Sequence, residues 1–377
     1  MKKRLVLWGG LGVVALLGAI GAAWILSLPS APKIDAAPPV ARNEAEAVLA
    51  ALKPPKRQRP LVAIIGINDA TETTDYLMPY GILSRADVAD VVALATEPGP
   101  VQLYPAFKVV PDMTAADFDA RHPDGADYVI VPAMSRDDDP AVLHWIRSQA
   151  DKGAIVIGVC AGAKVVGETG LLDGKRATTH WYYLDELRGK HPVRYVADRR
   201  IVVDRGVATT TGVTASMPMA LTLIAAIAGW GKADSVARGL GLEEWDLRHD
   251  SDAFLFTRSF ALTALRNALA FWNREQLGID LQPGADEVSL ALAADAWSRT
   301  YRSHAVTFAR TEEALETRSR LRILPDKVAM SWSAEHLLPA IGSLRPAEAL
   351  DQALQGIEAR YGSSTADIVA MQLEYRR

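Results

Sequence analysis

Short apolar runs rich in valine and isoleucine recur along the middle of the chain, and longer segments with helical spacing lie between them. Such runs are typical of strands buried on both faces, and their alternation with helices predicts a parallel sheet covered on both sides. The expected strands are Leu61–Ile67, Val91–Leu94, Phe107–Val110, Tyr128–Val131, Ala154–Val159, Ile201–Val203 and Val207–Thr210. The expected helices are Tyr76–Ala86, Asp139–Lys152, Ala161–Glu168 and Ser216–Ala228.

A different apolar pattern opens the chain, where Leu5–Leu28 is uncharged and largely apolar behind three basic residues. Its length suffices to cross a bilayer as a helix, so residues 1–29 are expected to anchor the protein in the inner (cytoplasmic) membrane. The charges predict a cytoplasmic N-terminus and an extracytoplasmic remainder. A cleaved signal peptide is the alternative. Residues 30–60, rich in Ala and Pro, are expected to form a tether.

Composition places the rest of the chain among ordinary globular proteins. Of its 377 residues, 49% are hydrophobic and 23% are charged, and the net charge is −4 with a pI near 6.0. This balance is not that of a disordered chain, and it gives no reason to expect a nucleic-acid partner. The histidines lack the spacing of metal ligands, and no glycine-rich loop follows a strand of the predicted sheet. Neither a metal nor a cofactor is therefore expected.

The candidate chemistry lies where the strand Ala154–Val159 ends. Cys160, the single cysteine of the sequence, follows this strand directly, and small residues open the next helix. A reactive side chain between a strand and a helix, with small neighbours at the turn, is typical of a nucleophile elbow. The N–H groups and the dipole of the helix are expected to favour the thiolate. The alternative is a small cysteine packed in the core.

The elbow and the run after it, Gly170–Trp181 (GLLDGKRATTHW), resemble the ThiJ/PfpI family of the class I glutamine-amidotransferase-like superfamily. The likeness extends to the AraC-associated amidase-like branch, although no helix-turn-helix signature follows Gly231. The resemblance implies an α/β fold with a flavodoxin-like parallel-sheet sandwich for residues 61–239.

The resemblance also implies partners for the thiol. Asp75 aligns with the acidic residue that the family carries on its first strand–helix connection. It would either hold a proton and donate it to the thiolate, or stay charged and raise the thiol pKa; helix N-capping is its alternative role. Glu72 is the second candidate acid. His180 corresponds to a histidine near the thiol of deglycase-like members, and its expected role is either a proton shuttle or a structural contact to the backbone.

The binding residues expected beside Glu72 depart in part from the family pattern. Ala161 stands where other branches have His or Thr, which argues against peptidase activity because a dyad of adjacent residues is unavailable. Ala133 and Met134 replace two glycines whose N–H groups form part of an oxyanion hole. The N–H groups of Ala133 and Met134 can serve as donors only where φ stays negative. Met134 is also expected to narrow the pocket, and Trp181 is expected to line it.

The second half of the sequence repeats features of the first. A shift of 214 positions without gaps places Arg85 on Arg299 and Asp112 on Asp326, and a shift of 133 places Asp234 on Asp367. We interpret residues 283–377 as a truncated ThiJ/PfpI-like copy without the cysteine, and chance similarity is the alternative.

Between the two units, residues 240–282 are expected to form a helical connector with its helix at about Ser259–Gln276. Because the family forms dimers, the resemblance implies either a homodimer or an intrachain pseudo-dimer in which the second copy covers the first.

Three functions are compatible with these features. The first is an enzyme that uses Cys160 on a small electrophilic molecule, with hydrolase, hydratase or deglycase-like chemistry, in which Asp75 and His180 handle protons. The second is a non-enzymatic, membrane-tethered redox or ligand sensor. The third is an accessory transcriptional regulator by family association, against which the missing DNA-binding motif counts.

Overall fold

A seven-stranded sheet forms the centre of the first unit in the computed structural model, which describes residues 16–31, 36–342 and 344–376. The strand order is β11-β12-β8-β7-β1-β3-β6, and every pairing is parallel except β11 with β12. The strands are β1 (Leu61–Gly66), β3 (Asp90–Ala95), β6 (Met113–Thr114), β7 (Tyr128–Val131), β8 (Ile155–Gly158), β11 (Ile201–Asp204) and β12 (Val207–Thr210). The predicted parallel α/β sheet is thus confirmed.

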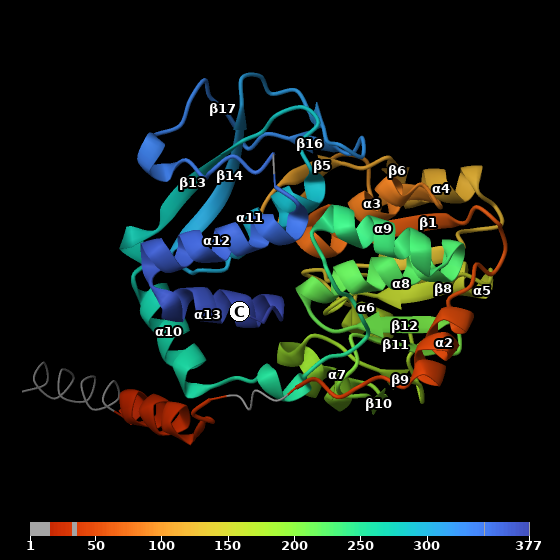
Figure 1. The fold of residues 1–377 in the computed structure, drawn as a ribbon, viewed down its shortest axis with the longest axis horizontal. Helices are drawn as coiled ribbons and strands as arrows, with labels where there is room; N and C mark the ends of the chain where they lie inside the picture. Colours follow the sequence, from red (N-terminus) through yellow and green to blue (C-terminus); the bar gives the residue numbers. More distant parts are fainter. Residues whose placement is uncertain (1–15, 32–35, 343, 377) are drawn as a thin grey trace, which may run out of the picture.

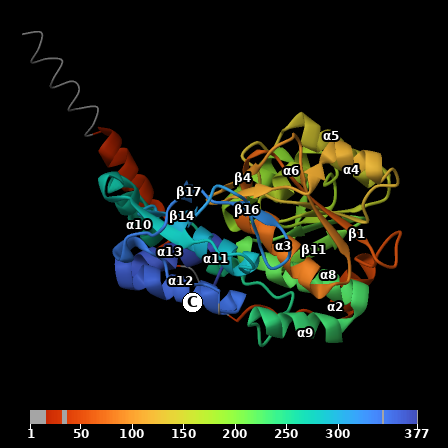
Figure 2. The same ribbon diagram turned by 90° about the horizontal axis from the view of Figure 1, so that it is seen from above.

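Helices cover both faces of this sheet, as Figures 1 and 2 show. Alternate residues of β1 point into two separate cores: Val62 and Ile64 enter one, and Ala63 and Ile65 enter the other. The first core lies under α3 (Thr73–Ala86), α8 (Ser216–Ala228) and α9 (Trp230–Leu240). The second lies under α4 (Ala115–Arg121), α5 (Pro140–Asp151) and α6 (Gly162–Glu168). The two helical layers do not include three short elements: β9 (Arg176–Ala177), α7 (Leu184–Lys190) and β10 (Arg194–Tyr195).

The C-terminal half builds a smaller parallel sheet of order β13-β14-β17. Its elements are β13 (Glu275–Asp280), α11 (Glu287–Ser298), β14 (Ser303–Ala309), β17 (Lys327–Val328), α12 (Pro346–Tyr361) and α13 (Ser363–Leu373). A further five-stranded sheet joins the two halves, because β16 of the second pairs with β5 of the first. Its strands are β2 (Asp69–Glu72), β4 (Val101–Tyr104), β5 (Lys108–Val110), β15 (Leu315–Glu316) and β16 (Arg322–Leu324).

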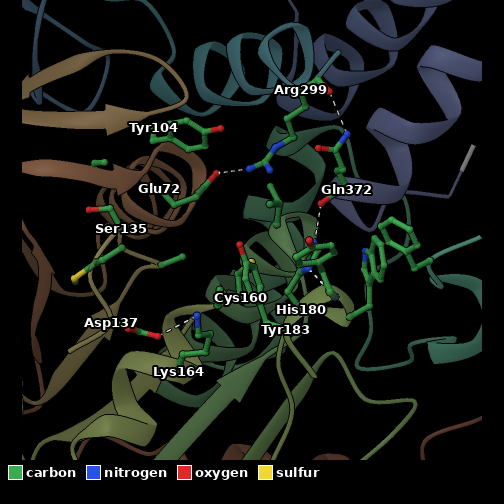
Figure 3. Close-up of a pocket in the computed structure, with 18 of the residues that line it drawn as sticks. Glu72, Tyr104, Ser135, Asp137, Cys160, Lys164, His180, Tyr183, Arg299 and Gln372 are labelled. Carbon is green, nitrogen blue, oxygen red and sulfur yellow. Dashed lines mark hydrogen bonds and ion pairs between the residues drawn. The ribbon is translucent and has the colours of Figure 1, made fainter. Parts of the chain in front are cut away.

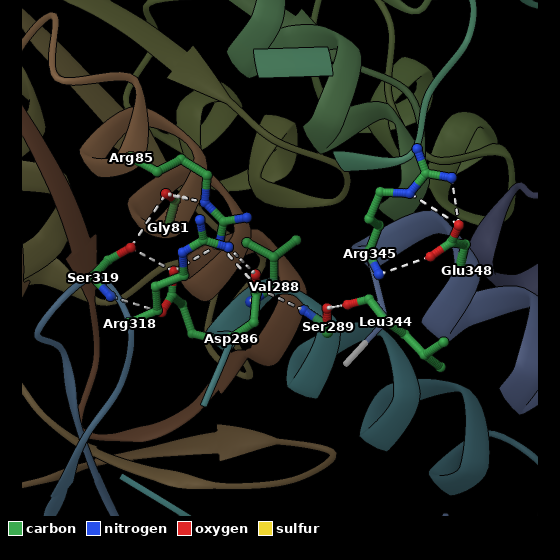
Figure 4. Close-up of polar contacts among 11 residues, drawn as sticks. Gly81, Arg85, Asp286, Val288, Ser289, Arg318, Ser319, Leu344, Arg345 and Glu348 are labelled. Atoms are coloured by element: carbon green, nitrogen blue, oxygen red, sulfur yellow. Dashed lines mark hydrogen bonds and ion pairs between the residues drawn. The ribbon is translucent and has the colours of Figure 1, made fainter. Parts of the chain in front are cut away.

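Helix α11 packs against α3, and buried ion pairs hold the two helices together. Arg85 Nη2 lies 2.9 Å from Asp286 Oδ1 and 3.0 Å from Glu287 Oε1 (Figure 4). Gly81 makes room for this contact, because a Cβ atom there would overlap the Glu287 carboxylate. Because Gly81 has no side chain, the Glu287 carboxylate of α11 can approach α3 closely.

The predicted connector helix Ser259–Gln276 is wrong at its C-terminal end. Helix α10 spans Arg258–Leu269, and β13 already begins at Glu275, whose N–H donates to Arg302 O over 2.9 Å. Pairing with β14 accounts for the difference, since it buries Leu277 and Ile279 on one face of a strand.

The predicted tether region carries helix α2 (Arg42–Ala51), which lies against the first unit. Glu44 Oε1 is 2.6 Å from Arg199 Nε, and the Tyr128 hydroxyl donates to Leu52 O over 2.7 Å. Leu52 is fully buried. This part of the segment is therefore anchored on the sheet by specific contacts.

The transmembrane anchor predicted over Leu5–Leu28, and with it the inner-membrane location, is contradicted. Within the described ranges, no helix has both the length and the apolar character needed to cross a membrane. Residues 1–15 of the predicted span lie outside these ranges, and residues 16–27 are helical. The end of this helix contacts α10, where Arg258 Nη2 donates to Leu26 O over 2.6 Å. The prediction followed the hydropathy of the sequence alone.

Candidate active site

Cys160 occupies a sharp turn between β8 and α6, as the sequence predicts. Its φ is 54°, a left-handed conformation that is strained for a residue with a side chain. The surroundings hold the turn: Cys160 N–H donates to Thr210 Oγ1 over 3.0 Å, and Thr179 Oγ1 donates to Cys160 O over 2.9 Å. Gly162 allows the close approach to β7, because a Cβ there would overlap the Val131 carbonyl. The turn directs the thiol toward a cavity (Figure 3).

The cavity has a volume of about 680 Å³ and lies between the two halves of the chain. Seven of the eight site residues expected from the sequence line it: Glu72, Ala133, Met134, Cys160, Ala161, His180 and Trp181. Asp75 does not line it, but lies close enough to the thiol for its charge to raise the thiol pKa. Other lining residues were missed: Tyr104, Asp137, Lys164, Tyr182, Tyr183, Phe256, Phe260, Arg299, Tyr301 and Gln372.

Asp75 is fully buried, and its surroundings favour a protonated carboxyl group. Burial, followed by the charge of Glu72, raises the pKa of Asp75 well above its usual range. Oδ2 accepts the Ala133 N–H over 3.1 Å, whereas Oδ1 has no hydrogen-bond partner. Helix N-capping, the alternative role, belongs instead to Glu72, whose side chain accepts the Asp75 N–H over 2.6 Å.

The thiol itself is not activated in the manner that its position suggests. Cys160 is only 5% exposed, and burial raises the pKa of its thiol well above the ordinary value, with Asp75 and Glu72 adding to the shift. The backbone N–H of Ala161 acts in the opposite direction and is outweighed. The expected preference for thiolate at the helix N-terminus is therefore wrong, because loss of hydration exceeds the favourable backbone interaction.

His180 is tied to the backbone at both ring nitrogens. Nδ1 accepts the Tyr182 N–H over 3.2 Å, so Nε2 carries the proton and donates to Gln372 O over 2.9 Å. Burial lowers the pKa of His180, which keeps the ring neutral. Of the two expected roles, this geometry matches the structural histidine, since neither nitrogen is free to move a proton.

A carboxylate from the C-terminal half fixes the loop beside His180. Glu374 Oε1 accepts the Trp181 N–H over 2.8 Å, and Oε2 accepts the Gly212 N–H over 2.7 Å. The indole N–H of Trp181 donates to Met371 O over 2.9 Å. We call residues 371–374 the C-terminal clamp. Local sequence patterns carry no signal for it, because the partners are about 190 residues apart.

Arg299 enters the same cavity from the second half, where it is held by two carboxylates. Nε lies 2.7 Å from Asp295 Oδ1, and Nη2 lies 2.9 Å from Glu72 Oε1. Burial raises the pKa of Asp295 to about 7, while the two neighbouring carboxylates raise that of Arg299 despite its burial. The predicted repeat would make Arg299 the counterpart of Arg85, but it does not predict that Arg299 lies at the thiol.

The other cation of the cavity is also paired. Lys164 Nζ lies 3.0 Å from Asp137 Oδ2 and 3.1 Å from Glu186 Oε1, and it sits 4.7 Å from the centre of the Tyr183 ring. Within the described ranges, no group of three or more His, Cys, Asp or Glu side chains could hold a metal ion. Because the Ala133 N–H is taken by Asp75, the oxyanion donor expected at this position is not free.

The model of the DJ-1/PfpI family matches residues 62–226. Isonitrile hydratase from Pseudomonas putida is 35% identical over 161 residues, which cover 41% of this chain and 67% of the hydratase. The HTH-type transcriptional regulator CdhR from Pseudomonas aeruginosa is 37% identical over 86 residues, 23% of this chain and only 26% of the regulator. The crystal structure of Drosophila melanogaster DJ-1beta aligns with a TM-score of 0.44 at 23% identity and covers 49% of this chain and 100% of its own.

The raised thiol pKa predicts slow alkylation near neutral pH. A raised pKa leaves less thiolate at pH 7 than in free cysteine, so the rate should increase with pH around a midpoint above about 8.5. Asp75→Asn should lower this midpoint, because the amide cannot become negatively charged. Iodoacetamide labelling followed by mass spectrometry measures both profiles. A midpoint below that of free cysteine in the wild type contradicts the assignment.

The C-terminal clamp predicts a specific effect of Gly212→Ala. The new Cβ would lie 2.6 Å from Glu374 Cγ and Cδ, so the carboxylate must move and release Trp181. We expect Cys160 alkylation to accelerate several-fold, and the free energy of unfolding to fall by about 1–3 kcal/mol in urea titrations. Gly231→Ala in α9, where a Cβ meets nothing within 4 Å, is the control: it should leave the alkylation rate unchanged and should not lower the free energy of unfolding. Equal behaviour of the two variants would exclude the clamp.

Proposed function

Because the chain belongs to the DJ-1/PfpI family, we propose that it uses Cys160 as a nucleophile on a small electrophilic molecule, with hydratase, hydrolase or deglycase-like chemistry. The observation that carries this proposal is the strained cysteine at the cavity wall with a buried, proton-holding carboxyl group beside it. The similarity to isonitrile hydratase supports including isonitriles with aldehydes, nitriles and acyl compounds in the substrate class.

Asp75 and Cys160 would share protons in this reaction. When the pair holds one proton, the form with a carboxyl group and a thiolate is the nucleophilic one. The sulfur forms a bond to the electrophilic carbon, and the Asp75 proton moves to the atom that gains the electron pair: the nitrogen of a nitrile, the oxygen of a carbonyl group, or the carbon itself in an isonitrile. An acyl substrate releases its leaving group with that proton. Water then adds to the same carbon and the carbon–sulfur bond breaks; one hydrogen of the water stays with the product and the other protonates the sulfur, which restores the one-proton pair of thiol and carboxylate. His180 takes no part in these transfers, because it orients the loop.

The alternative functions have less support. A redox sensor needs a thiolate that meets oxidant when no ligand is bound, whereas Cys160 is 5% exposed and burial raises its pKa. A ligand sensor would use the same cavity without turnover. A regulator is the weakest alternative, because the match to CdhR covers 26% of that protein and the net charge here is −4.

We also propose that the C-terminal half is a truncated second copy of the first. The starts of β13, α11, β16 and β17 follow those of β1, α3, β5 and β6 by 214 residues. The ends of α12 and α13 follow those of α8 and α9 by 133 residues. A side-chain contact repeats as well: Asp112 accepts the Ala93 N–H over 2.8 Å, and Asp326 accepts the Thr307 N–H over 2.9 Å.

The contact between the halves supports an intrachain pseudo-dimer over a homodimer. Val109 pairs with Ile323, its counterpart in the repeat, as expected at a two-fold axis. The pair Arg299–Glu72 corresponds under the same shift to the pair Arg85–Asp286. The α3 face is thus covered by the chain's own second half, and we expect light scattering to give a monomer. A dimer that dissociates when the α3 face is mutated would contradict this arrangement.

Substitution of the nucleophile tests the proposed activity. Cys160→Ser should abolish turnover of an electrophile found by screening aldehydes, nitriles, isonitriles and acyl compounds, while the circular dichroism spectrum and Tm stay unchanged. Asp75→Asn should lower kcat by about 10²-fold or more, because general acid–base catalysis contributes roughly that much. Turnover that survives Cys160→Ser contradicts the enzyme. Peroxide-dependent mass gain on Cys160, without turnover in either protein, supports the sensor instead.

A further inference from the structure

Aromatic side chains from both halves form much of the cavity wall. They are Tyr104, Trp181, Tyr182, Tyr183, Phe256, Phe260 and Tyr301. The first four belong to the cysteine-bearing unit. Phe256 lies just before α10, Phe260 lies within it, and Tyr301 lies in the loop after α11. At about 680 Å³, the cavity is far larger than an aldehyde or nitrile group requires. Most of this volume therefore serves the part of a ligand that does not react.

The aromatic rings are arranged to accept a further ring. Trp181 and Phe260 meet edge to face with their centres 5.7 Å apart, and Phe256 lies 6.2 Å from Tyr182. Tyr182 and Tyr104 keep 57% and 62% of their surface exposed, so protein covers only part of each side chain. Edge-to-face and offset contacts of this kind favour aromatic ligands over aliphatic ones of similar size.

The positively charged side chains of the cavity, Arg299 and Lys164, are already paired with carboxylates. Arg299 already contacts two carboxylates, and Lys164 contacts two others. A ligand carboxylate would have to compete with Glu72 and Asp295 for the Arg299 guanidinium. A ligand cation would have to displace this guanidinium from the two carboxylates. An anionic or a cationic ligand would lose its hydration on binding and would meet no unpaired group of opposite charge, which costs free energy.

We propose, on the basis of the proposed function, that the substrate is an uncharged electrophile carrying an aromatic group. The ring lies against the wall formed by Trp181, Tyr182 and Phe256, and the electrophilic carbon faces Cys160. The paired charges exclude ionic analogues, and the second half of the chain contributes to specificity through Phe256, Phe260 and Tyr301.

Unreactive probes test the ligand class without depending on turnover. Benzamide, benzoate, benzamidine and cyclohexanecarboxamide share one size, and their Kd values can be measured by ligand-observed NMR on full-length Cys160→Ser protein. Benzamide should bind at least tenfold more tightly than benzoate and benzamidine, and about threefold more tightly than cyclohexanecarboxamide. Benzoate or benzamidine binding as well as benzamide would overturn the exclusion of charge. Equal binding of cyclohexanecarboxamide would overturn the aromatic preference.

Two exposed aromatic residues give a matched pair of variants. Tyr182→Ala removes part of the wall and should weaken benzamide binding about fivefold, whereas Phe271→Ala, 64% exposed and outside the cavity, should leave it unchanged. Unchanged binding in Tyr182→Ala, with the fold verified by circular dichroism, overturns the assigned wall. Absence of turnover in the wild type counts against the proposed enzyme, while the ranking of the probes still decides the ligand class.

Discussion

The carboxylate of Glu72 joins the two halves of the molecule to the reactive turn. Its Oε2 accepts the N–H of Asp75 and the Thr74 hydroxyl, and its Oε1 is 2.9 Å from Arg299. One side chain therefore caps α3, sets the backbone beside the proton-holding acid and neutralises the guanidinium that enters from the other half. Loss of one partner from a buried pair of this kind costs about 3–5 kcal/mol. Removing Glu72 would thus disturb the site and the contact between the halves together.

Burial keeps the thiol of Cys160, the candidate nucleophile, in its protonated and less reactive form. The thiol and the Asp75 carboxyl both have raised pKa values, so each holds its proton more tightly than it would in water. Raised pKa values of this kind keep the thiolate fraction low, which protects the sulfur from oxidation and adventitious alkylation. Its reactivity then depends on a ligand that enters the cavity and provides a place for a proton.

Local sequence patterns predicted the first unit well and the site only in part. The strands Tyr128–Val131 and Val207–Thr210 and the helix Ser216–Ala228 agree with the structure to the residue, since apolar runs report burial directly. Cys160 and its elbow carried a local signal as well. Arg299 and Glu374 reach the site only through tertiary packing, and the state of the thiol depends on burial, which no local pattern encodes. The predicted membrane anchor likewise rested on hydropathy alone, and no helix of the described ranges has the length and apolar character of a membrane span.

The C-terminal clamp also has a consequence during synthesis. Glu374 leaves the ribosome 193 residues after Trp181, a delay of roughly 10–40 s at about 5–20 residues per second. The strands of the first unit can assemble within that interval, but the loop that shapes the thiol cavity cannot acquire its final partners. The nascent chain thus passes through a stage in which the sheet exists and the binding site does not.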